Sequence, residues 1–177
     1  MSILSARSRA PFIASLLAAA ALLLGGCAAP ADSATGSDHD DRTQAETTIV
    51  EDAWVKAVDD GMTAAFAVLS NDGHHDAHIV GASTTAAEMV ELHEVVVDGS
   101  GASTMRPVQG GLVVPAGGAL TLEPGGLHLM LMGVTAPLQP GDEIEIVLEF
   151  EDGSRATVSF VVKEFTGAEE EYPEGDH

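Results

Sequence analysis

The chain has 177 residues, and 28 Asp and Glu against 7 Lys and Arg give it a formal net charge of −21. This balance excludes nucleic acid as a partner, because phosphate binding requires a basic face. The single cysteine, Cys27, excludes an intramolecular disulfide.

The first 26 residues have the features of a signal peptide. Arg7 and Arg9 supply a positive start, and the apolar run at 11–24 is too short, at 14 residues, to span a bilayer comfortably. The small residues of LLGGC before Cys27 indicate a bacterial lipoprotein signal, in which this cysteine is lipidated and becomes the mature N-terminus. Simple secretion, with cleavage near Ala28 or Ala29 and no anchor, is the alternative. Both place a mature chain of net charge 5 − 28 = −23 outside the cytoplasmic membrane, and lipidation would anchor it to the outer face.

The remaining chain divides by composition into a tether, one domain and a tail. Residues 27–47 are rich in Ala, Ser, Asp and Gly and have no apolar period, which predicts a flexible tether. Residues 167–177 form an acidic stretch that we expect to be disordered. Residues 48–166 are long enough to enclose a single core.

The predicted domain is β throughout. Short apolar alternations are separated by turn sequences such as DDG, NDG, QGG, AGG, PGG and EDG, and no segment has a convincing helical period. This spacing predicts an all-β, cupredoxin-like or Greek-key β-sandwich or barrel. The expected strands are 48–58, 62–71, 78–84, 87–97, 103–108, 112–115, 119–123, 127–134, 143–150 and 156–165.

Enzyme motifs are missing from the sequence. It has no G-x-S-x-G elbow, no Gly-rich phosphate loop between a strand and a helix, and no cysteine in the predicted domain to act as a nucleophile. We therefore expect a protein that is not an enzyme.

The strand LHLMLMGV carries an unusual second face. Alternation puts its three leucines on one side, where they can fill the core, and His128, Met130 and Met132 on the other. Two interpretations are open for this second face. The methionines fill gaps in a further packing layer while His128 bonds a loop, or the imidazole and thioethers bind a ligand.

Two residues elsewhere favour a ligand. His93 lies in EMVELHEV, and Met105 follows a Gly-containing hairpin connection. Neighbouring strands can bring His93 and Met105 to one rim with His128 and Met130. Two imidazoles and two thioethers, without thiolate or carboxylate, suit Cu(I) better than Zn(II), Ca(II) or Mg(II). Without a cysteine ligand, an electron-transfer blue-copper site is disfavoured.

The run from ELHEVVVDGSGASTMRPV to PGGLHLMLMG resembles the periplasmic copper chaperones of the PCuAC family. The family's His, Met and His-x-Met ligands correspond to His93, Met105, His128 and Met130, although each of the two longer gaps, 11 and 22 residues, is one residue longer than in the family signature. The resemblance implies a cupredoxin-like fold, a copper ion near the surface, and delivery toward the dinuclear copper site of cytochrome c oxidase. It also makes Met132 a supporting residue rather than a ligand.

Other residues and functions remain as alternatives. His74, His75 and His78 have a spacing that suggests a second metal site, but exposed turn residues are the default interpretation. Met62, Met89 and Trp54 are expected in the core. The competing functions are a copper storage or resistance lipoprotein, which would bind several ions, and a non-metal Ig-like scaffold or adhesion module.

Overall fold

The computed structural model describes residues 41–97, 99 and 101–165. The predicted signal peptide, Cys27, most of the expected tether and the tail at 167–177 lie outside these residues. Within the described part of the chain, no helix is long and apolar enough to cross a membrane.

Strands are the dominant regular structure of the described chain, as predicted. One short helix, α1 (Gln44–Thr47), precedes ten strands. The strands are β1 (Thr48–Lys56), β2 (Met62–Asn71), β3 (Ala77–Thr84), β4 (Ala87–Val97), β5 (Ser103–Pro107), β6 (Leu112–Val114), β7 (Ala119–Leu122), β8 (His128–Val134), β9 (Glu143–Phe150) and β10 (Arg155–Lys163).

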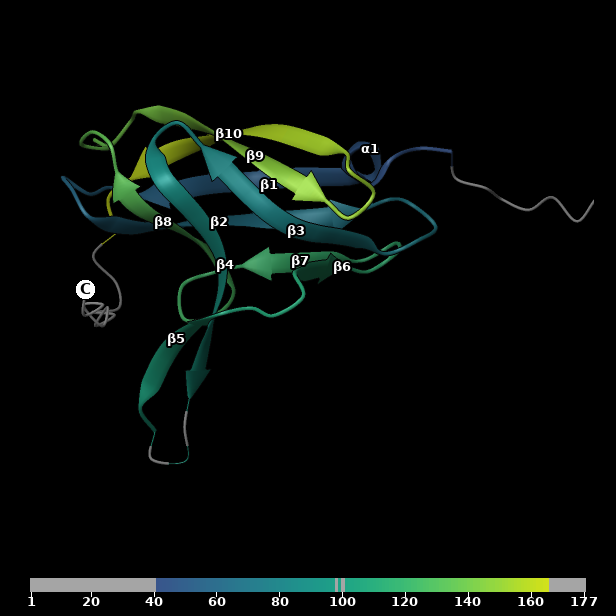
Figure 1. The fold of residues 1–177 in the computed structure, drawn as a ribbon, viewed down its shortest axis with the longest axis horizontal. Coiled ribbons are helices and arrows are strands. Elements are labelled where there is room, and N and C mark those ends of the chain that lie inside the picture. Colours follow the sequence, from purple (N-terminus) through teal and green to yellow (C-terminus); the bar gives the residue numbers. More distant parts are fainter. Residues whose placement is uncertain (1–40, 98, 100, 166–177) are drawn as a thin grey trace, which may run out of the picture. The chain divides into compact units, whose positions relative to one another are not determined.

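Seven strands close into a barrel, in the order β4-β8-β2-β1-β10-β9-β3 (Figure 1). The last strand of this order, β3, pairs with the first, β4, through the single pair Ala82 and Val90, and this pairing closes the barrel. β1 and β10 run parallel, whereas the other pairs in the barrel are antiparallel. The predicted all-β, cupredoxin-like fold is therefore confirmed, in its barrel form.

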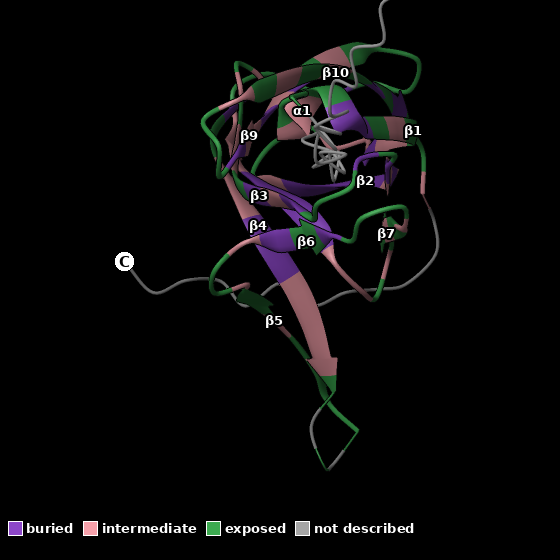
Figure 2. Ribbon diagram, turned by 90° about the vertical axis from the view of Figure 1, so that its right-hand side faces the viewer, coloured by how far each residue is buried: buried purple, intermediate pink, exposed green. Residues whose placement is uncertain are grey.

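The barrel is filled by alternate residues of its strands, as the period of two requires. Leu129 and Leu131 of β8 point inward and are almost completely buried. Val55, Ile146 and Phe160 join them from other strands, and Figure 2 shows the buried segments gathered where the strands surround this core. The core role predicted for the leucines of β8 is confirmed for Leu129 and Leu131, while Leu127 is only partly buried.

β4 and β5 form a hairpin that projects from the barrel, hereafter the β4–β5 arm (Figure 1). The pairing begins at His93 and Pro107 beside the barrel and ends at Val97 and Ser103. Burial decreases along the arm, and Val97 is 62% exposed. β4 therefore serves both as a barrel strand and as one side of the arm (Figure 2). The register places His93 where these two parts of β4 meet.

A β-bulge in β1 reverses which residues face the core. Glu51 pairs with Val68 but Trp54 pairs with Phe66, so one extra residue is inserted on the β1 side. Asp52 within this segment has φ 51°, an uncommon backbone conformation for a residue other than glycine. As a result Val55 enters the core, and Trp54 packs outside the barrel against Phe66, with ring centroids 4.6 Å apart. The expectation that Trp54 is a core residue was wrong.

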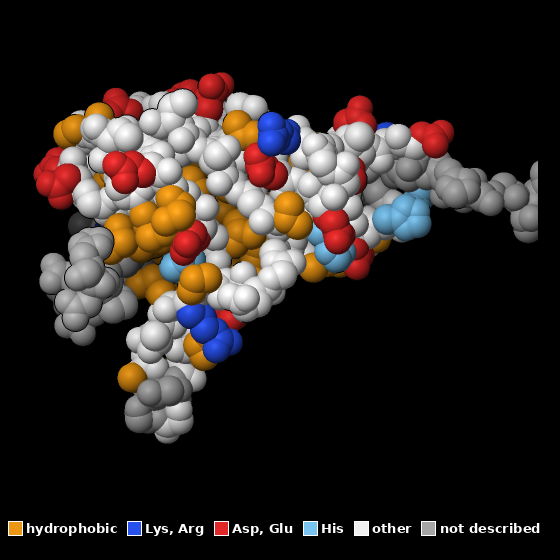
Figure 3. Space-filling model, in the orientation of Figure 1, with side chains coloured by type: hydrophobic (Ala, Val, Ile, Leu, Met, Phe, Trp, Pro, Cys, Tyr) orange, Lys and Arg blue, Asp and Glu red, His pale blue; other side chains and the backbone are white. Residues whose placement is uncertain are grey.

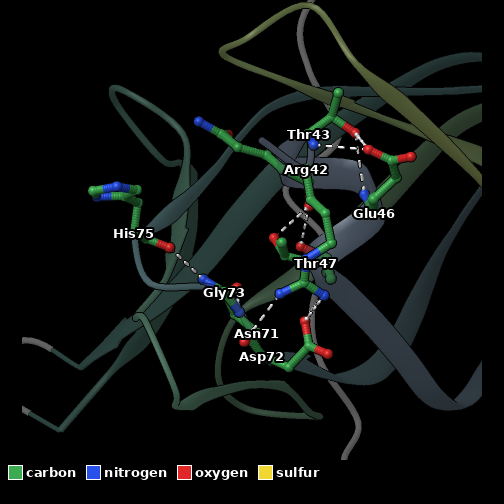
Figure 4. A network of polar contacts seen from close by, with 10 residues as sticks. Arg42, Thr43, Glu46, Thr47, Asn71, Asp72, Gly73 and His75 are labelled. Carbon is green, nitrogen blue, oxygen red and sulfur yellow. Dashed lines mark hydrogen bonds and ion pairs between the residues drawn. The ribbon is translucent and has the colours of Figure 1, made fainter. Parts of the chain in front are cut away.

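The last residues of the expected tether are part of the folded unit (Figure 4). Thr43 and Glu46 form a capping box at α1, in which Thr43 N donates to Glu46 Oε2 at 2.8 Å. Arg42 forms an ion pair of 2.9 Å with Asp72, and Gln44 N donates to Asp152 Oδ2 at 2.7 Å. Residues 42–47 are thus bound to the barrel by hydrogen bonds, so the ordered structure begins before Thr48.

Candidate metal centre

Both faces of β8 are buried at its start, although one face of a barrel strand is normally in contact with solvent. His128 is 1% exposed and Met130 is 4% exposed, while Leu129 between them is also buried in the core. His128 and Met130 belong to the outer face, together with Ala64 and Phe66 of β2. The outer face therefore carries a second buried cluster, and this cluster contains an imidazole and a thioether.

His93 and His128 are direct cross-strand partners. β4 and β8 pair in a register that places the two residues opposite each other, and their rings meet edge to face with centroids 5.7 Å apart. Two imidazoles that share one tetrahedral ion would have centroids about 5 Å apart, given metal–nitrogen bonds of about 2 Å. The separation is compatible with a shared ion after a small adjustment.

Each ring has a hydrogen bond that orients it. Nδ1 of His128 donates to the carbonyl oxygen of Gly126 at 3.1 Å, which leaves the lone pair of the neutral ring on Nε2. Nε2 of His93 donates to Oε2 of Glu91 at 2.9 Å, which leaves the lone pair of that ring on Nδ1. This Nδ1 is buried and has no hydrogen-bond partner among the described residues. Buried polar atoms nearly always have a hydrogen-bond partner, so the unpartnered Nδ1 of His93 is a candidate metal ligand.

The two predicted thioethers occupy neighbouring positions on the same face. Met130 follows His128 by two residues and lies opposite Glu91. Met105 lies opposite Val95 in the arm, one diagonal step from His93, and is half-buried. The register thus brings His93, Met105, His128 and Met130 onto adjacent positions of one surface, at the root of the arm.

Aromatic rings enclose the His128 side of this surface. The ring of Phe66 lies 6.3 Å from that of His128, and Trp54 packs on Phe66 and on Phe165. The bulge in β1 is what directs Trp54 to this position. An apolar wall strengthens electrostatic and coordination bonds nearby, because water is excluded.

Glu91 is the main site residue that sequence reasoning did not identify. Alternation places Glu91 on the same strand face as His93, but the sequence predicted only imidazole and thioether groups for the site. Glu91 could have been identified from its position, because it lies two residues before the candidate ligand His93 on the same strand. Histidine ligands of metals commonly donate their second N–H to a carboxylate, and Glu91 occupies that position.

The other methionines and histidines lie elsewhere. Met132 pairs with Met62 and Met89 and lies two residues after Met130, on the same face of β8. Met89 is 50% exposed, so its expected core position was wrong. His74 and His75 are exposed turn residues, and His78 Nδ1 lies 3.6 Å from Glu151. No group of three or more His, Cys, Asp or Glu in the described ranges is arranged to hold a metal ion.

The seven-stranded barrel has the fold of PCuAC-like domains. Solved structures of this class superpose on the chain. The copper-bound PCuAC domain from PmoF2 is 18% identical with a TM-score of 0.55, over 67% of this chain and 93% of that domain, which shows a common fold. The resemblance to the PCuAC family is confirmed at this level.

The family of the chain follows from sequence matches. The family model described as "Putative lipoprotein LpqE-like" matches residues 48–162, and the chain belongs to this LpqE-like lipoprotein family. Putative lipoprotein Lxx21020 of Leifsonia xyli subsp. xyli (strain CTCB07) is 46% identical over 157 residues, which are 86% of this chain and 91% of the relative. The Cu(I) form of DR1885 from Deinococcus radiodurans is 35% identical with a TM-score of 0.54, over 68% of this chain and 80% of that chain.

Proposed function

We propose that this protein is an extracytoplasmic Cu(I)-binding chaperone, without enzymatic activity, whose ligands are His93, Met105, His128 and Met130. The observation that carries the proposal is the buried His93–His128 pair, in which the His93 Nδ1 lone pair has no hydrogen-bond partner among the described residues. The similarity to DR1885, solved with Cu(I), supports the choice of ion.

The donor set explains the choice chemically. Thioether sulfur and neutral imidazole nitrogen are soft to intermediate ligands that favour Cu(I), and they carry no charge to attract Mg(II) or Ca(II). No thiolate is needed, which suits an oxidising compartment where free thiols are at risk.

The position at the root of the arm suggests how the ion is released. His128 and Met130 are buried, whereas Met105 is half-buried on the outermost strand of the sheet, β5. A partner's ligands can approach from the Met105 side and replace the four ligands one at a time. Copper then moves by ligand exchange and no large rearrangement of the barrel is required.

The location and recipient form the second half of the proposal. Cys27 is lipidated after removal of residues 1–26, and residues 27–41 connect the anchor to the barrel on the outer face of the cytoplasmic membrane. The family name and the Leifsonia relative, both described as lipoproteins, support this location. Delivery toward the dinuclear copper site of cytochrome c oxidase rests on the PCuAC resemblance.

A competition titration tests the ligand set. The purified protein is titrated with Cu(I) against a chromogenic Cu(I) chelator under anaerobic, reducing conditions. We expect one tightly bound ion per chain, with much weaker binding in His128→Ala and Met130→Ala and unchanged binding in His75→Ala, a control at an exposed turn position. Equal affinities for wild type and for variants at all four ligand positions would refute the proposal.

A further inference from the structure

Methionine is distributed unevenly between the two faces of the sheet. Five of the six methionines fall within the described residues, and the strand register places all five on the outer face of β5, β4, β8 and β2. None of them belongs to the barrel core, which is built from Leu, Val, Ile, Ala and Phe. Gap filling in the core therefore does not account for this residue choice.

Three of these methionines form one cross-strand row. Met132 of β8 is paired with Met62 of β2 on one side and with Met89 of β4 on the other. Directly opposed residues in antiparallel strands have Cβ atoms about 5 Å apart. The methionine side chain is long and flexible, so three sulfurs in such a row can converge on one atom.

The row lies beside the proposed copper centre and is open to solvent at Met89. Met89 is 50% exposed, and Met62 and Met132 are half-buried. Met130, which is buried, lies on the same face of β8 as Met132, two residues away and therefore about 7 Å along the strand. Figure 3 shows hydrophobic side chains gathered over the region of β4 and β8, with a histidine and an acidic side chain among them.

We propose that Met62, Met89 and Met132 form a second Cu(I) site, made of thioethers alone, through which the ion reaches the His93, Met105, His128 and Met130 centre. Three neutral sulfur donors select a soft monovalent ion over the hard divalent cations of the extracytoplasmic space. The hand-over rests on the proposed function, whereas the existence of the three-methionine site does not.

The transfer is a ligand exchange that conserves charge and oxidation state. Met130 sulfur replaces one sulfur of the row while the ion keeps its other bonds. The two imidazole nitrogens then replace the remaining sulfurs of the row, and Met105 sulfur adds the fourth bond. The ion stays Cu(I), no electron is exchanged, and no proton is released because each neutral imidazole binds through its lone pair.

Methyl NMR can observe each sulfur separately. The full chain, labelled with ¹³C at the methionine methyl groups, is titrated anaerobically with Cu(I) supplied as its acetonitrile complex. We expect the first equivalent to shift the Met105 and Met130 signals and the second to shift those of Met62, Met89 and Met132. The proposal is overturned if the latter three signals stay in place through two equivalents.

Two variants separate this site from the primary centre. The triple variant Met62→Leu, Met89→Leu and Met132→Leu keeps side-chain volume, and we expect it to bind the first equivalent normally and to lose the second. The variant His93→Ala with His128→Ala should lose tight binding and still show Cu(I)-induced shifts of the three row methionines. If the histidine variant still binds Cu(I) tightly, the proposed function is wrong. The NMR signals of Met62, Met89 and Met132 in the same variant then still decide whether the three-methionine site exists.

Loading kinetics test the hand-over. Stopped-flow mixing of the wild type with Cu(I) measures how fast the primary centre fills, and we expect the triple variant to fill it several-fold more slowly at equal final affinity. Equal rates would overturn the entry role. If the triple variant unfolds at lower temperature than the wild type, Met89→Leu alone, at a half-exposed position, provides the same measurement.

Discussion

Glu91 and His93, two residues apart on β4, are joined by a 2.9 Å hydrogen bond that directs the other nitrogen of the imidazole into the buried cluster. The carboxylate thereby fixes both the tautomer and the orientation of the ring in the absence of the proposed ion. Glu91 acts through His93 and is a positioning residue rather than a ligand in this arrangement.

Replacing Glu91 is therefore expected to weaken Cu(I) binding. Removal of such an outer partner typically costs about 10- to 100-fold in metal affinity, so Glu91→Ala should fall in this range. Glu91→Gln, which keeps an oxygen acceptor for the ring N–H, should lose less. Competition titration gives both values. Glu94→Ala, whose carboxylate pairs with Arg106 instead, is the matched control, and an equal loss in Glu94→Ala would contradict the positioning role.

The two faces of β8 should respond to mutation in opposite ways. Leu131→Ala removes a fully buried core side chain and should lower the free energy of unfolding by about 2–5 kcal/mol with little effect on Cu(I) affinity. Met130→Leu conserves volume and should cost less than about 1.5 kcal/mol while weakening Cu(I) binding. Urea unfolding and Cu(I) competition measure the two quantities. A Met130→Leu protein that binds like wild type would remove Met130 from the ligand set.

The hydrogen bonds of Glu46 and Asp152 around α1, hereafter the α1 clamp, should make stability depend on pH. A hydrogen bond from Thr43 N, then one from its hydroxyl, lowers the pKa of Glu46 below the ordinary 4.5. Partial desolvation opposes ionisation of Asp152, but hydrogen bonds from Gln44 and Ser154 together lower the pKa of that carboxyl below 3.8.

A depressed carboxyl pKa contributes stability that is complete above the ordinary pKa and is lost as the pH falls through the lowered value. We expect Glu46→Gln with Asp152→Asn to be less stable than wild type at neutral pH, and the difference to shrink as the pH falls below about 4. Urea unfolding across this range measures it. A difference that stays constant with pH would show that ionisation of the clamp does not matter.

Adjacent glycines provide a paired test of backbone packing. Gly110 and Gly111 both have positive φ, 87° and 88°, but a Cβ on Gly111 would lie 2.4 Å from the carbonyl oxygen of Ile79, whereas one on Gly110 would meet nothing within 4 Å. Gly110→Ala should cost about 1–2 kcal/mol for its conformation alone, and Gly111→Ala should cost clearly more. Thermal or urea unfolding decides, and equal costs would mean that the Ile79 contact relaxes freely.

Cys27 lies outside the described residues, and its role can be tested in cells. Cys27→Ser removes the atom that would carry the lipid, so we expect the protein to move from the membrane fraction to the soluble extracytoplasmic fraction. Labelling with a radioactive fatty acid should be lost at the same time. Serine at a neighbouring position, Ala28→Ser, is the control. Unchanged fractionation of the Cys27→Ser protein would argue against lipid anchoring.

The sequence predicted most of the strands, because alternation and turn residues are local signals. It also indicated that His93, His128 and Met130 could meet, because neighbouring strands of a sheet can bring residues distant in sequence to one rim. The position of Trp54 could not be predicted, because one inserted residue at the bulge reverses the alternation that follows it. The exposure of Met89 could not be predicted either, because it depends on where the barrel ends, which is a long-range property. The same holds for the attachment of residues 42–47, which depends on contacts with Asp72 and Asp152, far away in sequence.

The β4–β5 arm has a practical consequence for work with this protein. His93 is at its root, whereas Gly101 at the other end has positive φ and open space where a side chain would stand. Residues added in this turn lengthen the loop without changing the pairing of His93 with Pro107 or with His128. A fluorophore or an affinity peptide inserted at the tip is therefore expected to leave the strand register of the proposed copper ligands His93, His128 and Met130 unchanged.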